Sequence, residues 1–382
     1  MLVCSGLEAG RDGVGDYCRF LAEEFAKLGH PSMALSLNDR LVERETSGVC
    51  GSGRGVELVR LPALESPRAR YARAKGVIEQ WRPDWVSLNF VSYGFQSRGL
   101  PIAELSFLPR LFAARHLAVM LHELWVGLDD DRSPKNRLLY GPVQRRLLLA
   151  LLRRLRPARL GTTNPCYRAV LAGYGVDAEV VPLFGNIPVG RQNADDWLYR
   201  DLAAQGAIDA DFVRPRSWLL GMFGLIDPSW PAATVFSRLA GIAQRADRRA
   251  VIVSIGNAGE HASALFDHAK ALSPQLNFAI LGPRPAERIS QFLNSVDFGL
   301  SSYPYSLLGK SGAVAAMLEH GLPVIVSRGL REVPFPVVDP LFEELLWPND
   351  SALEGKLIDP PVRRQFAARP AEVAKRLLAS FG

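Results

Sequence analysis

Short apolar runs alternate with amphipathic stretches along most of the chain. The first run, residues 1–5, precedes a glycine-containing loop and a stretch to Leu28 in which apolar residues recur at helical spacing, and Gly29 marks its end. Apolar runs predict further strands at 32–37, 56–61, 84–91, 117–121, 159–163 and 178–183, with helices at 67–81, 102–115, 136–155 and 165–173. Strands separated by helices of this length are typical of parallel β/α units.

The alternation pauses over residues 184–216 and then restarts. Strands are predicted at 218–223, 250–255, 277–281 and 298–300, helices at 231–245 and 260–272, and a mostly helical tail from residue 339. We therefore predict an α/β protein of two Rossmann-like, doubly wound domains facing across a cleft. The predicted parts are a first domain at 1–186, a linker with a helical insertion at 187–216, a second domain at 217–360, and at 361–382 a helix that can cross back to the first domain.

Composition narrows the choice of partners. The chain is 48% hydrophobic, enough for a sizeable core, and its net charge of +6 comes from basic residues that are scattered rather than clustered. A nucleic-acid partner is therefore not expected, whereas an anionic substrate or membrane surface stays open. The four cysteines have no metal-binding or CxxC spacing, and neither a secretory leader nor a membrane span is recognisable, so we expect a cytoplasmic protein with reduced thiols.

Residues 281–326 contain the pattern that best suits a ligand. A predicted strand ends in Ser301 and Ser302, and Gly309-Lys310-Ser311-Gly312 then precedes a helix of small residues. Free backbone N–H groups, the helix dipole and the lysine ammonium would all favour a phosphate there. An ordinary crossover with a solvated lysine fits the same pattern. A Walker A loop is excluded because Pro304 occupies the position of its first glycine.

The loop after the first strand is the second candidate. Gly13 and Gly15 lack the GxGxxG spacing of dinucleotide-binding loops, but glycine would let the backbone approach a ligand closely. A flexible connection is the alternative. Asp16 is predicted either to contact an acceptor or to cap the first helix. His320, just before Gly321, is predicted to place positive charge at a helix end.

Three segments resemble a known family, the retaining glycosyltransferases of the GT-B fold, family four. They are the Gly13-Val14-Gly15-Asp16-Tyr17 loop, the Leu121-His122-Glu123 strand end, and residues 289–326 with the ending Gly-Leu-Pro-Val-Ile. The resemblance implies that the first domain binds the acceptor and the second binds a nucleotide sugar. The implied catalytic residues are His122 and Lys310; those for the donor phosphates are Gly13, Gly15, Gly309, Lys310, Ser311 and Gly312; those for base and ribose are Pro283, Arg284 and Ile289; and those for the acceptor are Asp16 and Tyr93.

The chain also departs from the family. Two glutamates are usual at spacings that correspond to Leu308 and Ala316, and Glu319 does not replace them because it should face another direction on the helix. An arginine and a lysine usual after the first strand of the second domain are missing from residues 224–230. Neutralisation of the diphosphate should then depend on Lys310 and the helix N-terminus, helped by Arg284 or Arg11.

The resemblance implies a glycosyltransferase that moves a hexose-type sugar from a nucleoside diphosphate to a sugar, lipid-linked or small-molecule acceptor, with retention. No cofactor and no metal are expected. The alternatives are a catalytically degenerate nucleotide-sugar-binding protein and, third, a nucleotide-sugar isomerase. The leucine- and arginine-rich stretch from Arg137 to Leu160 predicts either a weak contact with an anionic membrane or a surface helix packed by its leucines. In the first case the protein would be peripheral at the inner membrane face.

Overall fold

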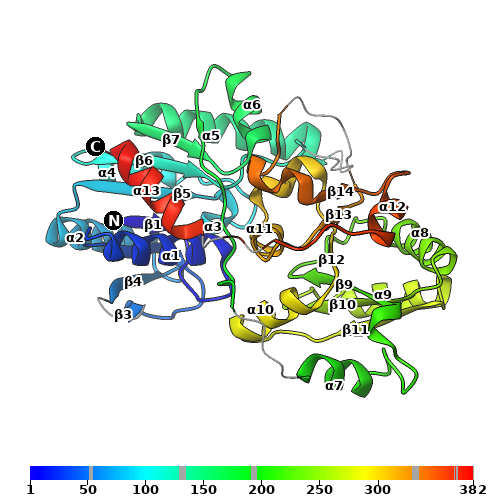
Figure 1. Ribbon diagram of the computed structural model, residues 1–382. Coiled ribbons are helices and arrows are strands. Elements are labelled where there is room, and N and C mark those ends of the chain that lie inside the picture. Colours follow the sequence, from blue (N-terminus) through cyan, green and yellow to red (C-terminus); the bar gives the residue numbers. More distant parts are fainter. Residues whose placement is uncertain are drawn as a thin grey trace. The chain divides into compact units, whose positions relative to one another are not determined.

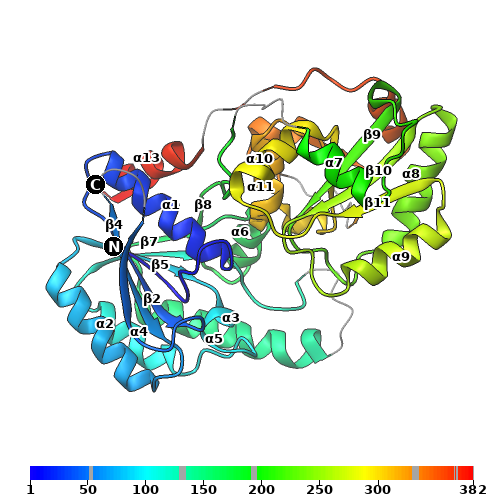
Figure 2. The same cartoon turned by 90° about the horizontal axis from the view of Figure 1, so that it is seen from below.

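The computed structural model describes residues 1–50, 55–128, 135–190, 196–328, 335–364, 366 and 369–381. The chain divides into two compact units, Met1–Asn186 with Arg369–Gly382, and Ile187–Ala368. In each unit helices cover a sheet that is parallel throughout or, in the first unit, all but one edge strand (Figures 1 and 2). The predicted α/β class with two parallel-sheet domains is confirmed.

The first unit is built on an eight-stranded sheet of order β3-β4-β2-β1-β5-β6-β7-β8. Its strands are β1 (Leu2–Cys4), β2 (Met33–Asp39), β3 (Thr46–Cys50), β4 (Val56–Pro62), β5 (Trp85–Phe90), β6 (His116–Leu121), β7 (Arg159–Thr162) and β8 (Glu179–Val180). Its helices are α1 (Gly13–Lys27), α2 (Pro67–Trp81), α3 (Ser92–Phe95), α4 (Glu104–Phe112), a π-helix (Asn136–Tyr140), α5 (Gly141–Leu155), α6 (Pro165–Ala172) and α13 (Arg369–Phe381).

Strand β3 was not predicted from the sequence. It pairs antiparallel with β4 at the edge of the sheet and is largely exposed, so it has no buried face to produce an apolar alternation. The sequence predicted a plain loop at Gly51–Gly55, of which residues 51–54 lie outside the described residues.

The C-terminal helix completes the core of the first unit. Helix α13 lies beside α1 (Figures 1 and 2), and Val373, Ala374 and Leu377 are buried in the same apolar cluster as Phe25 of α1. The Phe381 ring stacks on Trp85 with centroids 4.7 Å apart. Helix α13 thus packs in the core of the first unit although it is far from the rest of that unit in sequence: Arg376 of α13 pairs with Glu179, 197 positions earlier.

The second unit is built on a six-stranded, fully parallel sheet of order β11-β10-β9-β12-β13-β14. Its strands are β9 (Ser217–Phe223), β10 (Arg249–Ile255), β11 (Leu276–Ile280), β12 (Phe298–Ser301), β13 (Val324–Val326) and β14 (Leu346–Pro348). Its helices are α7 (Trp197–Ala204), α8 (Ala232–Arg245), α9 (Ala262–Leu272), α10 (Ala286–Ser295), α11 (Gly312–Glu319) and α12 (Leu353–Ile358), with short 3₁₀ turns η2 (Arg214–Arg216), η3 (Tyr305–Lys310) and η4 (Pro340–Leu345). The tail that was predicted to be mostly helical contains η4, α12 and α13. It also contains the short strand β14, which was not predicted because three residues are too few to show a period.

Both sheets reverse their strand order once. The reversal falls between β1 and β5 in the first unit and between β9 and β12 in the second. At such a switch point the loops that follow the two central strands diverge and leave a crevice at the carboxyl edge of the sheet, where α/β proteins bind ligands. Ligands are therefore expected at the loops after β1, β5, β9 and β12.

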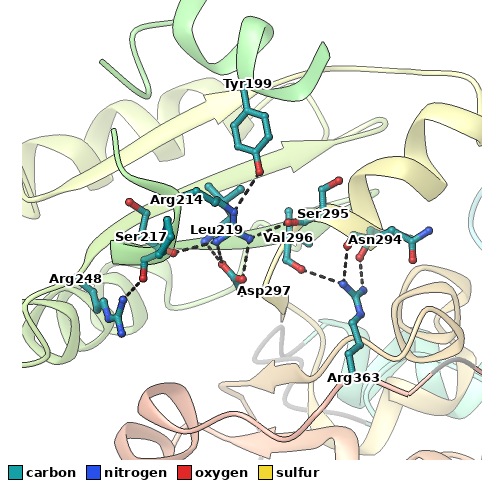
Figure 3. Close-up of polar contacts among 12 residues, drawn as sticks. Tyr199, Arg214, Ser217, Leu219, Arg248, Asn294, Ser295, Val296, Asp297 and Arg363 are labelled. Atoms are coloured by element: carbon teal, nitrogen blue, oxygen red, sulfur yellow. Dashed lines mark hydrogen bonds and ion pairs between the residues drawn. The ribbon is translucent and has the colours of Figure 1, made fainter. Parts of the chain in front are cut away.

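The opposite, amino-terminal edge of the second sheet is held by a network of arginine contacts (Figure 3). Arg214 pairs with both carboxylate oxygens of Asp297 at 2.8 and 2.9 Å, and Asp297 also accepts a hydrogen bond from the Leu219 amide. Arg363 donates to the carbonyls of Asn294 and Val296 at the end of α10. Burial lowers the pKa of Arg363 to about 10, so it stays cationic at neutral pH. These contacts fasten the segments that flank the sheet.

Candidate active site

In the first unit, carboxylates surround the start of α1. Asp12 caps the helix, and its Oδ1 accepts from the amides of Val14 at 2.9 Å and Gly15 at 3.1 Å. Asp16 lies in the first turn and accepts from the Gly10 amide at 3.1 Å and from Asn186 at 3.2 Å. The capping role considered for Asp16 therefore belongs to Asp12. Two carboxylates at this loop favour hydroxyl groups as ligands over phosphate.

The two glycines of this loop have different surroundings. A Cβ on Gly15 would lie 2.5 Å from the carbonyl oxygen of Gly6, so close packing of α1 on the preceding loop requires glycine there. A Cβ on Gly13 would meet nothing within 4 Å. Packing alone explains Gly15, whereas Gly13 faces open space. Their proposed contacts with a donor stay predictions.

His122 follows β6 and is buried. Its Nε2 lies 3.0 Å from Oδ1 of Asn89, and its ring meets Tyr17 edge-on with centroids 4.9 Å apart. Burial lowers the pKa of His122 to about 4, so the ring is neutral at pH 7. Because a neutral imidazole that donates through Nε2 accepts through Nδ1, His122 offers a hydrogen-bond acceptor and no positive charge.

Tyr93 is anchored by a residue that the sequence reasoning missed. Gln144 of α5 is 1% exposed; its Nε2 lies 2.9 Å from the Tyr93 hydroxyl and 2.9 Å from the Arg98 carbonyl, and its Oε1 accepts from the Val126 amide at 3.0 Å. Gln144 thus ties together the loops after β5 and β6. Its signal in the sequence is a single amide on the buried leucine face of α5.

In the second unit, the predicted phosphate loop lies where the switch point requires. Gly309 and Lys310 end η3, which follows β12, and Gly312 begins α11. Ser311 is the N-cap, and its Oγ accepts from the Val314 amide at 3.3 Å. A Cβ on Gly312 would meet nothing within 4 Å, so the start of α11 is sterically open. This arrangement places the positive end of the helix dipole at the carboxyl edge of the sheet, beside the switch point.

The two positions that lack the family's glutamates are inside the core. Leu308 is 1% exposed and Ala316 is fully buried. Glu319 is also buried, at 3% exposure. Carboxylates at Leu308 or Ala316 would be buried away from water, which is costly for a charged group, so their absence agrees with the burial of these positions.

The prediction of a positively charged His320 was wrong. Its Nδ1 donates to the Ala316 carbonyl at 2.7 Å, and its Nε2 accepts from the Ser290 hydroxyl at 2.9 Å. The Ser290 Oγ in turn accepts from the Gly190 amide at 2.8 Å. Burial lowers the pKa of His320, so the ring is a neutral link between α10 and α11.

The residues predicted for base and ribose are dispersed. Pro283 and Arg284 are exposed after β11, and Arg284 pairs with Asp201 at 2.8 Å, whereas Ile289 is buried in α10. Strand β11 is separated from β12 by β10 and β9, which corresponds to three strand spacings, about 14 Å. The structure therefore brings Lys310, Ser311 and Gly312 together, but not Pro283 and Arg284 with them.

A polar cluster that sequence reasoning missed spans the second switch point. The Asp227 amide donates to the Ser302 hydroxyl at 3.0 Å, across the gap between the loops after β9 and β12. Arg328, after β13, places NH1 2.6 Å from Oδ2 of Asp227, and Trp230 Nε1 donates to the Ser327 hydroxyl at 2.7 Å. Although partial burial opposes ionisation, hydrogen bonds from Ser229 and the charge of Arg328 lower the pKa of Asp227.

Two broader properties concern metals and membranes. Among the residues that the structure describes, no three His, Cys, Asp or Glu side chains are grouped so as to hold a metal ion. Within the same ranges, every helix is too short or too polar to cross a bilayer.

Two successive Rossmann-like units, each with one reversal of strand order, define the GT-B fold of glycosyltransferases. Solved structures of that class match nearly the whole chain. HepE from Anabaena, determined with UDP and glucose, has a TM-score of 0.53 and 13% identity, over 99% of this chain and 95% of HepE. The catalytic domain of starch synthase IV from Arabidopsis thaliana, bound to ADP and acarbose, has a TM-score of 0.56 and 9% identity, over 100% and 98% of the two chains.

A UDP-forming trehalose-phosphate synthase from Burkholderia vietnamiensis matches at a TM-score of 0.50 and 11% identity, over 100% of this chain and 94% of the synthase. At such identities the likeness establishes the fold, and the predicted GT-B fold is confirmed. No protein-family profile matches the sequence, and no curated protein matches it.

Proposed function

We propose that the protein is a glycosyltransferase that moves a hexose-type sugar from a nucleoside-diphosphate donor to an acceptor hydroxyl, with retention of configuration. The observation that carries the proposal is the loop after β12, where Lys310 and the start of α11 meet at the switch point of the second sheet. Structures of the same fold contain UDP with glucose, UDP-glucose or ADP, which supports a nucleotide sugar as the donor.

The chemistry needs charge stabilisation more than acid–base catalysis. The bond from the anomeric carbon to the diphosphate oxygen breaks, the new bond to the acceptor oxygen forms on the same face, and the proton of the acceptor hydroxyl passes to the departing diphosphate oxygen. The departing diphosphate gains negative charge, which Lys310 and the α11 dipole would stabilise. His122, neutral at pH 7, would accept a hydrogen bond from a hydroxyl of the transferred sugar. We propose that this chemistry requires neither a metal ion nor a cofactor.

A specific observation favours a second candidate, a nucleotide-sugar-binding protein without turnover. Leu308 and Ala316 occupy the positions of the two missing glutamates, so these positions offer no carboxylate to the donor sugar. Both residues are buried, at 1% and 0% exposure. The protein would then keep the phosphate loop and the fold but lose the transfer step.

Thermal-shift measurements across UDP, GDP and ADP and their sugars identify the donor, because a ligand that binds the native state raises its stability. Incubation of the stabilising sugar nucleotide with a panel of glycosides, with and without EDTA, then tests turnover. Release of the nucleoside diphosphate with EDTA present supports the metal-free transferase. Binding without transfer or hydrolysis supports the binding protein, and no shift with any nucleotide rejects both.

We also propose that the π-helix and α5 contact an anionic membrane surface, which would suit a lipid-linked acceptor and a peripheral location at the inner membrane face. Leu138, Leu139 and Val143 are exposed by 79%, 59% and 36% at one end of this element. Exposed arginines follow along α5: Arg146, Arg153 and Arg154. Apolar side chains beside basic ones are typical of helices that lie in the membrane interface.

Vesicle pelleting tests this contact. Vesicles with anionic lipid should retain the protein at low salt, and neutral vesicles should not. Replacing Leu138 and Leu139 together by serine should abolish retention, whereas Leu64→Ser, at a site 81% exposed elsewhere on the same unit, should not. Equal pelleting of all three proteins, or none with anionic lipid, rejects the membrane contact and favours a solvated surface helix.

A further inference from the structure

The loop after β9 lacks the basic residues that the family resemblance leads one to expect. Residues 224–230 read Gly-Leu-Ile-Asp-Pro-Ser-Trp and contain one charged side chain, the carboxylate of Asp227. A donor diphosphate at the second switch point would lie beside this loop and would need positive charge there. The structure supplies that charge from another strand.

Arg328 contacts both loops that flank the switch point. It follows β13, and its NH1 reaches Oδ2 of Asp227 in the loop after β9, at 2.6 Å. Its main-chain carbonyl accepts from the Tyr305 amide at 2.9 Å, where η3 begins. Its side chain is only 12% exposed, so the guanidinium is held in place rather than solvated.

We propose that Arg328 is a donor-diphosphate ligand that replaces the cations missing after β9, and that Asp227 holds it in position before the donor binds. This inference rests on the proposed function, because it names a further residue of the same site. It assigns to Arg328 the pyrophosphate and not the base or the sugar.

The chemistry of the guanidinium allows both contacts. Arginine has five N–H donors in a planar fork, so one edge can stay with Asp227 while the other binds phosphate oxygens. Asp227 is itself fixed, because its Oδ1 accepts from the Ser229 amide at 2.8 Å and hydroxyl at 2.7 Å. The Trp230–Ser327 hydrogen bond fastens the β9 loop to the residue before Arg328. The cation is therefore preorganised, at little entropic cost on binding.

Removing the charge of Asp227 and removing the charge of Arg328 should change the affinity for a diphosphate in opposite directions. Asp227→Asn keeps an oxygen that can accept from Arg328 and hold it in position, but it removes the negative charge that cancels much of the field of Arg328. It should therefore strengthen attraction for a diphosphate, whereas removing the guanidinium should weaken it. A pair that only stabilises the fold would behave otherwise, because loss of either partner would disturb the site in the same direction.

Calorimetric titration with UDP, GDP and ADP, and with the corresponding nucleosides, tests the assignment. We expect Arg328→Gln to weaken binding of the preferred diphosphate roughly 10-fold to 100-fold, the scale of a charge-assisted hydrogen bond. Asp227→Asn should strengthen it several-fold, and Arg328→Lys should fall between wild type and Arg328→Gln. Affinity for the nucleoside should not change in any of them.

A matched pair in the same unit is the control. Arg245 and Glu354 form an ion pair of similar length, 2.7 Å, that is more exposed than Arg328 and Asp227, and Arg245→Gln and Glu354→Gln should leave diphosphate affinity unchanged. If Arg328→Gln does not fold, as judged by circular dichroism, the opposite shifts of Asp227→Asn and Arg328→Lys decide the question. Unchanged diphosphate affinity in folded Arg328 variants overturns this inference and leaves the proposed function intact. Wild-type protein that binds no nucleoside diphosphate overturns both.

Discussion

The Nε2 atom of His122 lies 3.0 Å from Oδ1 of Asn89, and this contact decides which ring nitrogen carries the proton. The amide orientation of Asn89 is set independently, since its Nδ2 donates to the carbonyl of Ser87 at 3.2 Å. The buried amide therefore holds the imidazole in the Nε2–H tautomer and leaves Nδ1 as an acceptor.

Replacing Asn89 by aspartate should raise the pKa of His122, because a carboxylate at the same position stabilises the imidazolium. Nitrogen chemical shifts of the His122 ring, followed over pH, would report both tautomer and pKa. An unchanged titration in a folded Asn89→Asp protein would mean that the amide does not control the ring. Turnover should fall in the same variant if a neutral His122 is required.

Acid should destabilise the first unit through His122. Burial lowers the pKa of His122 to about 4 from an ordinary value of 6.5, so between these values the unfolded chain binds more protons than the folded one. The free energy of unfolding contains the full contribution of the neutral, buried His122 above pH 6.5, and it loses this contribution as the pH falls toward 4. From pH 7.5 to pH 5 the loss should be about 2 kcal/mol.

Denaturant unfolding of wild type and His122→Gln at the two pH values measures this contribution. The stability difference between pH 7.5 and pH 5 should be smaller in the variant, while other titrating groups affect both proteins alike. An equal difference in the two proteins would exclude His122 as the source.

Lys310→Ala should weaken binding of nucleoside diphosphates by roughly 1–3 kcal/mol, because it removes a charge-assisted contact with the phosphates. Lys356→Ala is a suitable control, since the Lys356 ammonium lies over the Trp347 ring, 5.7 Å from its centroid, on α12. Calorimetry with UDP and GDP would refute the role of Lys310 if both lysine variants bound as tightly as wild type.

Restoring a family glutamate should damage the fold. Ala316 is fully buried, so Ala316→Glu would force a larger side chain and a carboxyl group into an apolar core, and we expect a loss of at least about 3 kcal/mol in unfolding free energy. Ala315→Glu on the neighbouring, half-buried position of α11 should cost much less. A stable Ala316→Glu protein with higher donor affinity would instead indicate that this position reaches the ligand.

The sequence predicted those parts of the molecule whose signal is local. Alternation of apolar runs and helices gave the two parallel sheets, and the glycine and lysine spacing around Lys310 gave a loop that the structure places at a switch point. Strand β3 escaped prediction because neither of its faces is buried. Base and ribose residues were assigned by resemblance, and Arg284 follows a strand that lies three strand spacings from the strand before the phosphate loop.

Side-chain contacts that depend on the order of strands in the sheet could not be predicted from the sequence. Asp227 and Arg328 are 101 positions apart, and their loops meet because β9 and β13 lie on either side of β12 in the sheet. Gln144 is a single polar residue on an otherwise apolar helix face. Hydrophobic periodicity does not reveal the role of one such residue. Both cases are polar residues whose partners lie on other elements of the fold.

Helix α13 affects when the first unit can finish folding during synthesis. Its apolar side chains complete the core around α1, yet they are synthesised after every residue of Ile187–Ala368. At translation rates of roughly 5–20 residues per second, the apolar side chains of α1 that pack against α13 lack this cover for about 10 seconds or more while the second unit is made. We expect chaperones to bind these side chains during this interval, and a chain that ends before α13 to leave them uncovered permanently.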